Sequence, residues 1–528
     1  MTRKISRRQF LGEASCASVG SASLFSTLLN MRMTNTAAAY QANNSTDSDD
    51  YKALVCLFLA GGNDSFNMLV PMDNDKHAEY QQIRSDLALA QDSLLPLNGT
   101  TENGRSYGVH PAMPEVQQLY NSGDLALVAN VGTLVEHTTK EGIESGVAKL
   151  PVGLYSHIDQ IAHWQTSVPD KRSSIGWGGR TADLLHSLND NQNISMNISI
   201  SGSNIFQAGN SMVEYAIEPR GNGSIGINGF DQPIDAWDLI KKSAIESLLD
   251  VEYQNLFEQT LANTKRGALD NHFQFSNAIG AVSPFQTVFS ENQISKSFEM
   301  IAKTIAARQT LGFKRQTFFI LFGGWDHHDE VLNNQMAMLS VVSKAMSEFN
   351  TVMKELGVHD KVTTFTASDF ARTLTSNGAG SDHAWGGNHM VMGGSVNGTK
   401  IYGQYPDLFV GNALDTGRGA LIPTISCDEY FAEMAAWFGV SSSDLSAVLP
   451  NIGRFYDTSS EKPPIGFMGD AVPATSLPFQ QYLPVIKEDS LLERVQKPKV
   501  ATPFLTGVSA AAAGMLALRT RQTDEDSD

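Results

Sequence analysis

The chain has 528 residues, of which 41% are hydrophobic and 18% charged, and its formal net charge is −18 at pH 7. This is the composition of an ordinary globular protein, long enough for one large domain with additions or for two or three domains. The acidic balance excludes the class of proteins that bind nucleic acid through a broadly basic surface.

The first 39 residues are predicted to be a twin-arginine (Tat) signal peptide. Arg7 and Arg8 stand in the run Ser-Arg-Arg-Gln-Phe-Leu, which is followed by the moderately apolar, Ser-rich stretch 16–29 and by the small residues Ala37-Ala38-Ala39. This order is typical of an exported precursor. It predicts export by the Tat translocase to the periplasm or the cell exterior, with residues 40–50 as a polar linker.

Two cysteines, Cys56 and Cys427, remain after the predicted signal. They could form one disulfide, but Cys56 lies within an apolar run, which favours a buried thiol. The chain has no CxxC motif and no cysteine cluster. Haem attachment and iron-sulfur chemistry therefore lack ligands.

Strand-like and helix-like patterns alternate from residue 51 to about residue 455. Apolar runs typical of buried strands occupy 52–60, 125–131, 318–322 and 362–367, with 390–392 as a shorter candidate. Helical patterns occupy 111–120, 154–164, 294–311 and 331–356. Such alternation predicts an α/β fold with a largely parallel central sheet.

Three segments depart from this alternation. Residues 200–290 are expected to form an insertion or a cap, and residues 456–528 a partly disordered C-terminal extension. The apolar run 505–518 is too short to span a bilayer and is interpreted as a terminal helix or tail, so no stable membrane span is expected in the mature protein. The run 221–226 matches GxGxxG, but it lacks the preceding buried strand and the following helix of a dinucleotide site, which predicts a glycine-rich loop.

Acidic residues follow three of the predicted strands. Asp64 comes after 52–60, Asp326 with two histidines after 318–322, and Asp369 after 362–367. Since the carboxyl ends of parallel strands meet at one edge of a sheet, these side chains are expected to share a site. Carboxylates and imidazoles together are ligands for a divalent metal. The predicted ligands are Asp64, Asp326, His328, Asp369, His383 and His389.

Simpler roles exist for each of these residues, because the aspartates could form turns or cap helices and the histidines could bond within the core. Ser156 is predicted to be the N-cap of the helix near 154–164, and a serine there could also act as a nucleophile toward a bound anion. Arg180 and Arg372 are candidate anion clamps, with paired surface arginines as the simpler reading.

Together these motifs resemble the Tat-exported DUF1501 family. The resemblance extends over roughly residues 50–455 and is carried by the Tat signal, by Phe58-Leu-Ala-Gly-Gly-Asn-Asp64, Ser156-His157, Gly323-Gly-Trp-Asp-His-His328, Ser368-Asp-Phe-Ala-Arg-Thr373 and Asp382-His-Ala-Trp-Gly-Gly-Asn-His389. That family is similar to the alkaline phosphatase and sulfatase superfamily. The resemblance implies an α/β domain over residues 51–455 with helices on both faces of the sheet.

By position, the resemblance implies that Ser156 is the nucleophile and that Asp64, Asp326, His328, Asp369 and one or both of His383 and His389 bind metal. The expected function is an exported metal-dependent hydrolase or transferase of phosphate or sulfate esters. Its cofactor would be one or more divalent ions, such as Zn, Mn or Ca, and its substrate a small-molecule or glycan ester.

The ligand pattern also departs from that superfamily. His328 follows Asp326 more closely than is usual there, and Phe370 stands where the later aspartate is commonly followed by a histidine. These departures support an alternative, a non-catalytic exported binding or assembly protein on a degenerate fold.

Overall fold

The structure is a computed structural model that describes residues 50–99, 101 and 104–469. The predicted signal peptide, the linker up to residue 49, and the C-terminal extension from residue 470 lie outside these residues. Among the helices of the described part, none combines the length and apolarity needed to cross a membrane.

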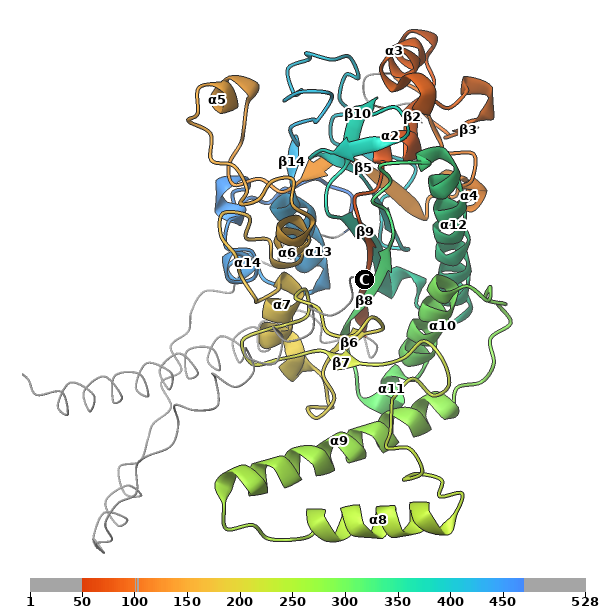
Figure 1. Ribbon diagram of the computed structural model, residues 1–528, viewed down its shortest axis with the longest axis vertical. Helices are drawn as coiled ribbons and strands as arrows, with labels where there is room; N and C mark the ends of the chain where they lie inside the picture. Colours follow the sequence, from red (N-terminus) through yellow and green to blue (C-terminus); the bar gives the residue numbers. More distant parts are fainter. Residues whose placement is uncertain (1–49, 100, 102–103, 470–528) are drawn as a thin grey trace, which may run out of the picture. The chain divides into compact units, whose positions relative to one another are not determined.

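A mixed, mostly parallel sheet forms the centre of the molecule (Figure 1). Its strand order is β13-β5-β12-β9-β1-β8-β6-β7, with β14 paired to β5. Among the described residues, the strand pairs of this sheet are all parallel except those of β12, which runs antiparallel to both β5 and β9. The strands are β1 (Lys52–Ala60), β5 (Leu125–Gly132), β6 (Asn197–Ser199), β7 (Tyr215–Ala216), β8 (Arg315–Gly323), β9 (Val362–Ser368), β12 (Gly387–Met392), β13 (Ile401–Tyr402) and β14 (Ile425–Ser426).

Helices cover both faces of this sheet (Figure 1). On one side lie α6 (His157–Thr166), α7 (Trp177–Leu185) and α13 (Cys427–Phe438), and on the other α4 (Pro114–Asn121), α10 (Gln293–Ala306) and α12 (Val331–Glu355). The central strands β1, β5 and β9 are buried on both faces, which explains the long apolar runs of β1 and β5. The predicted α/β fold with a largely parallel sheet and helices on both faces is confirmed.

Shorter elements complete the described part of the chain. Two small sheets pair β2 (Leu69–Pro71), β4 (Tyr107–Val109) and β3 (Leu95–Pro96), and β10 (Arg372–Ser376) with β11 (Ser381–His383). The remaining α-helices are α2 (Ser65–Met68), α3 (Asn74–Arg84), α5 (Lys140–Glu144), α8 (Ala236–Leu249), α9 (Leu256–Gly280), α11 (Arg308–Leu311) and α14 (Leu445–Val448).

Element boundaries differ from the predicted ones where local chemistry intervenes. The helix expected from residue 111 begins at Pro114, because proline fits the first helical position, whose N–H has no partner within the helix. The helix expected over 294–311 is divided at Ala307, whose ψ of 2° leaves the helical range. The strand expected over 390–392 extends back to Gly387 and is antiparallel.

Within residues 200–290 the chain forms a pair of neighbouring helices, α8 and α9 (Figure 1). The glycine-rich run 221–226 is a turn region between β7 and α8, so the prediction that it is a loop is confirmed. Cys56 and Cys427 are both free and buried, which confirms the buried thiol over the disulfide.

One buried acid gives the fold a pH dependence. Burial raises the pKa of Asp428, in the first turn of α13, to about 7 although Arg180 lowers it. One of its carboxyl oxygens, Oδ1, finds no partner among the described residues. The folded state therefore holds a proton between pH 4 and pH 7 that the unfolded chain has released.

The stability of the protein is expected to fall as pH rises through this window, and Asp428→Asn is expected to remove that loss. The free energy of unfolding of the variant should exceed that of the parent by on the order of 2–4 kcal/mol at pH 8 and by much less at pH 4. Chemical unfolding at both pH values measures the difference, with exposed Asp86→Asn as the control. An equal gain at both pH values would contradict the assignment.

Candidate functional site

Three strand ends meet at one edge of the sheet. β1 lies between β8 and β9 in parallel register, so the segments after Ala60, Gly323 and Ser368 leave the sheet together. A side chain at Gly61 would place its Cβ 2.5 Å from the backbone nitrogen of Asp326, and the φ of Gly61 is +121°. Only glycine therefore allows the first strand end to approach the Asp326 backbone this closely.

The buried guanidinium of Arg372 ties these segments together. Its Nε donates to the Gly62 carbonyl over 2.9 Å and its Nη1 to the Ser381 carbonyl over 3.0 Å. Its Nη2 donates to the Gly61 carbonyl and pairs with the Asp326 carboxylate. The planar fork of arginine suits several fixed oxygen acceptors at once, so Arg372 holds the site's backbone in place.

A short hairpin, β10 and β11, brings the late histidine to this edge. Arg372 and His383 are directly paired across its two strands. Its turn packs against the chain after β8, where Asn377 Nδ2 donates to the His328 carbonyl over 3.0 Å. A Cβ on Gly380 would come within 2.5 Å of the His327 carbonyl oxygen, so the hairpin needs glycine there.

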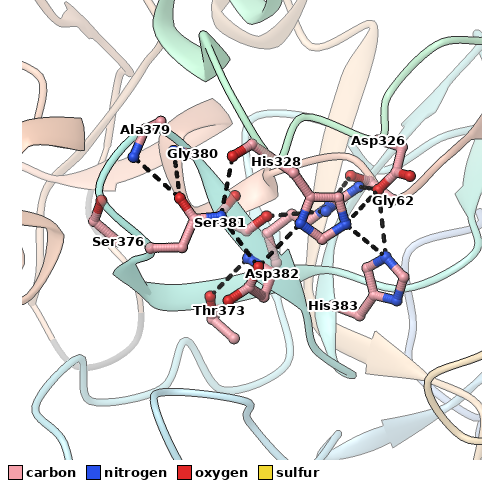
Figure 2. A network of polar contacts seen from close by, with 12 residues as sticks. Gly62, Asp326, His328, Thr373, Ser376, Ala379, Gly380, Ser381, Asp382 and His383 are labelled. Carbon is pink, nitrogen blue, oxygen red and sulfur yellow. Dashed lines mark hydrogen bonds and ion pairs between the residues drawn. The ribbon is translucent and has the colours of Figure 1, made fainter.

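Four side chains converge on the outer side of these strand ends, and we call them the histidine cluster: His157, Asp326, His328 and His383. The Nε2 atom of His383 lies 3.0 Å from Nε2 of His157 and 3.0 Å from Nε2 of His328. The Asp326 carboxylate lies 3.1 to 3.4 Å from all three Nε2 atoms. Figure 2 shows the rings of His328 and His383 turned toward each other beside Asp326.

The other ring nitrogen of each histidine contacts an oxygen acceptor. The Nδ1 atoms lie 2.7 Å from Asp369 Oδ2 for His157, 3.0 Å from Asp382 Oδ1 for His328, and 2.9 Å from the Tyr155 carbonyl for His383. Such acceptors fix the proton on Nδ1 and leave a lone pair on Nε2. Three Nε2 lone pairs and a carboxylate thus face one point.

Lone pairs this close repel one another unless a cation lies between them. A proton shared by two rings or a metal ion would meet this need. Nitrogen and oxygen ligands in a group of four, with each imidazole held by an outer acceptor, fit a divalent transition metal. Ligand atoms of His157, Asp326 and His383 all lie within 4.8 Å of one another, which makes this a possible metal site.

The charges around the histidine cluster are strongly coupled. The hydrogen bond to Asp369 raises the pKa of His157, whereas burial lowers the pKa of His383. Partial burial alone would raise the pKa of Asp326, but the Arg372 guanidinium and the histidines hold it below its usual value. The side chain of Asp326 is 46% exposed and that of His328 is 45% exposed, so a ligand can reach the cluster from solvent.

Asp369 is 1% exposed and takes an outer position. Its Oδ1 accepts a hydrogen bond from the Gly61 backbone over 3.0 Å, and its Oδ2 contacts His157. It therefore orients a cluster histidine, and both of its oxygens have partners.

Asp64, a predicted ligand, lies apart from the histidine cluster. Its carboxylate is fully buried and pairs with Arg84 over 2.5 Å, and Ser381 Oγ donates to the same oxygen over 2.8 Å. Gly61 and Gly62 lead the chain away from the sheet edge before residue 64, so the Asp64 side chain lies in the core. A buried carboxylate with a buried arginine partner is a structural ion pair.

His389 is also a core residue. It lies in β12, its ring centroid is 4.7 Å from that of Trp164, and burial lowers its pKa to about 3. His327, between two cluster residues in sequence, is buried with neither ring nitrogen bonded to a described residue. In the segment that follows β8, His327 is buried whereas its neighbours Asp326 and His328 are exposed.

Ser156 is the N-cap of α6, as predicted, with its Oγ 3.5 Å from the Asp159 backbone nitrogen. It stands between Tyr155, whose carbonyl holds His383, and His157, which joins the cluster. The two candidate anion clamps are occupied by backbone carbonyls: Arg372 as described, and Arg180 by those of Thr166, Ile175 and Val448.

The sequence motifs did not single out His157 as a ligand. Its position directly after an N-cap serine explained the local sequence, and the element that carries it is far in sequence from β8 and β11. A signal was present, since Ser156-His157 is one of the motifs that carry the family resemblance, but the motif alone favoured the serine.

Comparisons with known proteins agree with that resemblance. The model of the family described as "Protein of unknown function (DUF1501)" matches residues 241–420, which include Asp326, His328 and His383 but not His157. The resemblance to this family is thus confirmed over that part of the chain. No curated protein sequence matches the chain.

Several solved structures overlap with this chain at low similarity. The lipoteichoic acid synthase LtaP from Listeria monocytogenes is 8% identical, with a TM-score of 0.26 over 68% of this chain and 67% of that one. The PsFucS1 sulfatase from Pseudoalteromonas sp. is 10% identical, with a TM-score of 0.29 over 78% and 71%. Ps i-CgsB in complex with k-i-k-neocarrahexaose is 10% identical, with a TM-score of 0.30 over 77% and 78%. Overlaps of this size say nothing about the substrate.

The histidine cluster is expected to bind a divalent transition metal. His157→Ala and His383→Ala are each expected to reduce the metal content per chain to a small fraction of the parent's. Each substitution removes one nitrogen from a four-ligand set. Elemental analysis of the purified protein after dialysis against trace zinc gives the content per chain. His137→Ala, which removes an exposed histidine, should leave it unchanged. Equal metal content in all three variants would refute the site.

Asp64→Asn is expected to lower the free energy of unfolding by about 3–5 kcal/mol, since it leaves the buried Arg84 charge unpaired. Metal content should stay that of the parent in whatever protein remains folded. The matched control is Asp75→Asn, which breaks the more exposed pair with Arg105 and is expected to change the free energy of unfolding far less than Asp64→Asn does. Loss of metal without loss of stability would restore Asp64 as a ligand.

Proposed function

We propose that this protein is an exported metal-dependent hydrolase or transferase of phosphate or sulfate esters. The proposal rests above all on one observation, the convergence of three Nε2 atoms and the Asp326 carboxylate on one point. The choice of ester rests on the resemblance of the sequence motifs to the DUF1501 family, which is similar to the alkaline phosphatase and sulfatase superfamily. Export to the periplasm or cell exterior rests on the Tat-like sequence of residues 1–39.

The residues of the cluster suit a transition metal better than calcium. Three imidazoles and one carboxylate match the preferences of ions such as Zn²⁺, and also of Mn²⁺ less closely, whereas Ca²⁺ prefers six or more oxygens. When bound, such an ion would stabilise negative charge on an ester oxygen or activate a nucleophile at neutral pH. His157, His328, His383 and Asp326 would hold one ion.

The surrounding residues keep this set in one geometry. Asp369 and Asp382 orient two of the imidazoles, and the Tyr155 carbonyl orients the third. Several outer hydrogen bonds of this kind raise the basicity of a ligand histidine and prevent its rotation. Burial opposes the charge of Asp382, yet Asn377, Arg418 and His328 lower its pKa to about 2, so it stays an acceptor.

Ser156 is the residue that we assign as the nucleophile. It is partly exposed and begins α6, so its hydroxyl lies beside the positive end of a helix and next to a cluster histidine in sequence. The substrate's anionic group would then lie between this helix end and the cluster. Arg372 would act through Asp326 and the backbone rather than by contact with substrate.

A second candidate function, a non-catalytic exported binding or assembly protein, is favoured by the arginines. The guanidinium groups of Arg180 and Arg372 donate their hydrogen bonds to backbone carbonyl oxygens and, for Arg372, also to Asp326. Neither arginine is therefore arranged as a clamp for a substrate anion. In that case the histidine cluster would bind metal for structure alone.

Hydrolysis of aryl phosphates and aryl sulfates by the zinc-loaded or manganese-loaded protein separates these functions. The enzyme hypothesis expects activity that a chelator removes and that Asp326→Ala lowers at least about 100-fold, since charge stabilisation at the reacting group is lost. Ser156→Ala should lower the rate while leaving metal content intact. Bound metal with no hydrolysis of either ester class would favour the binding protein, and activity unchanged in Asp326→Ala would overturn the proposal.

A further inference from the structure

A second polar network lies outside the histidine cluster, in the loop between β7 and α8. His272, on α9, is 6% exposed and is contacted from both sides. Its Nδ1 lies 3.0 Å from Ser224 Oγ, and its Nε2 lies 2.5 Å from Asp231 Oδ2. Ser224 belongs to the glycine-rich run 221–226, for which the sequence offered no role beyond a loop.

The protonation pattern of this network follows from its partners. An ionised Asp231 only accepts hydrogen bonds, so the proton of the neutral imidazole lies on Nε2. Nδ1 is then the acceptor and faces the Ser224 hydroxyl. The Tyr215 hydroxyl lies 2.7 Å from Ser224 Oγ, and burial raises the pKa of Tyr215, which keeps it protonated and able to donate to Oγ.

These groups border a cavity of about 650 Å³. Tyr215, Ser224, Ile225, Thr264, Ala268 and His272 are among the residues that line it. Asp231 is not among them and contacts the far nitrogen of the histidine. The hydroxyl, the imidazole and the carboxylate therefore follow one another away from the cavity, with the histidine buried between them and Asp231 35% exposed. This is the order of groups in an activated serine.

Two glycines of the loop permit this arrangement. A Cβ on Gly226 would lie 2.5 Å from His272 Nε2 and 3.1 Å from Asp231 Oδ2, so a side chain there would separate the pair. Gly223 has a φ of +78°, and its Cβ would come within 2.9 Å of the Phe275 ring. The loop thus needs glycine on both sides of Ser224 to seat the serine against α9.

We propose that Ser224, His272 and Asp231 form a serine-esterase site that is independent of the histidine cluster and takes carboxylic esters small enough for this cavity. Ser224 Oγ attacks the ester carbonyl carbon while its proton passes to His272 Nδ1. The bond to the leaving alcohol breaks, and the alcohol takes that proton. Water then attacks the acyl-serine and gives a proton to His272 Nδ1. The acyl bond to Oγ breaks, the carboxylic acid leaves, and Ser224 recovers its proton.

Tyr215 is a positioning residue in this site. When its hydroxyl donates to Ser224 Oγ, 2.7 Å away, the serine proton is left to point toward His272. The second hydroxyl near Nδ1, that of Ser276, is 3.4 Å away and is the weaker partner. Ser276→Ala is therefore the matched control for Ser224→Ala, because both remove one hydroxyl that contacts the same nitrogen.

A fluorescent fluorophosphonate, which forms a phosphorus–oxygen bond with an activated serine as fluoride leaves, tests the site. The purified protein carrying Ser156→Ala, treated with chelator, should be labelled, and peptide mapping should place the adduct on Ser224. Ser224→Ala should abolish the adduct and Ser276→Ala should retain it. Asp231→Asn should slow labelling about 10²-fold or more, because a neutral amide no longer stabilises the positively charged form of His272.

Hydrolysis of p-nitrophenyl butyrate gives a second measure. The rate should be unaffected by chelator and should fall about 10²–10⁴-fold in Ser224→Ala, while the thermal unfolding midpoint stays close to that of the parent. Absence of an adduct on Ser224, or labelling at the same rate in Asp231→Asn, would overturn the proposal and leave a network that only fastens the loop to α9. Absence of metal-dependent ester hydrolysis at the histidine cluster would not affect these results.

Discussion

The arrangement of the strand ends at the candidate site depends on one buried charge, the guanidinium of Arg372. A buried arginine is costly to desolvate unless all of its donors find acceptors. Here the acceptors are carbonyls from the segment after β1 and from β11, together with the carboxylate after β8. Satisfying that charge fixes three separate chain segments relative to one another. The glycines after β1 make the required approach, and His383 is placed by its direct pairing with Arg372 across the hairpin.

The need of a buried charge for a partner also explains why two aspartates that follow neighbouring strands have different surroundings. Asp64 turns inward and needs a buried cation, which Arg84 supplies at 2.5 Å. Asp326 turns outward, remains 46% exposed, and shares its charge between Arg372 and three imidazoles. An inward carboxylate stabilises the fold only through its partner, whereas an outward one keeps an oxygen available for a ligand. Strand-end position alone does not distinguish these outcomes, but side-chain direction does.

Histidine tautomers distinguish the two polar networks of this molecule. In the histidine cluster, oxygen acceptors hold the Nδ1 protons and leave the Nε2 lone pairs facing one another, so the set requires a cation. At His272, Asp231 holds the Nε2 proton and leaves Nδ1 facing a hydroxyl, so the set is already satisfied and polarises the serine. The first arrangement suits metal binding and the second suits proton transfer.

The sequence by itself determined the central strands and the layered α/β fold, because strands buried on both faces are rich in apolar and β-branched residues and those runs are local. It also determined the N-cap at Ser156 and the position of Asp326 and His328 directly after a strand of the sheet, since these are local features, but it left His383 and His389 as alternatives. Only the tertiary structure decided that His157 joins them while Asp64 and His389 do not. Those outcomes depend on the direction of individual side chains and on contacts between residues more than 150 positions apart, such as His157 with Asp369 and His383, and local sequence patterns do not encode such contacts.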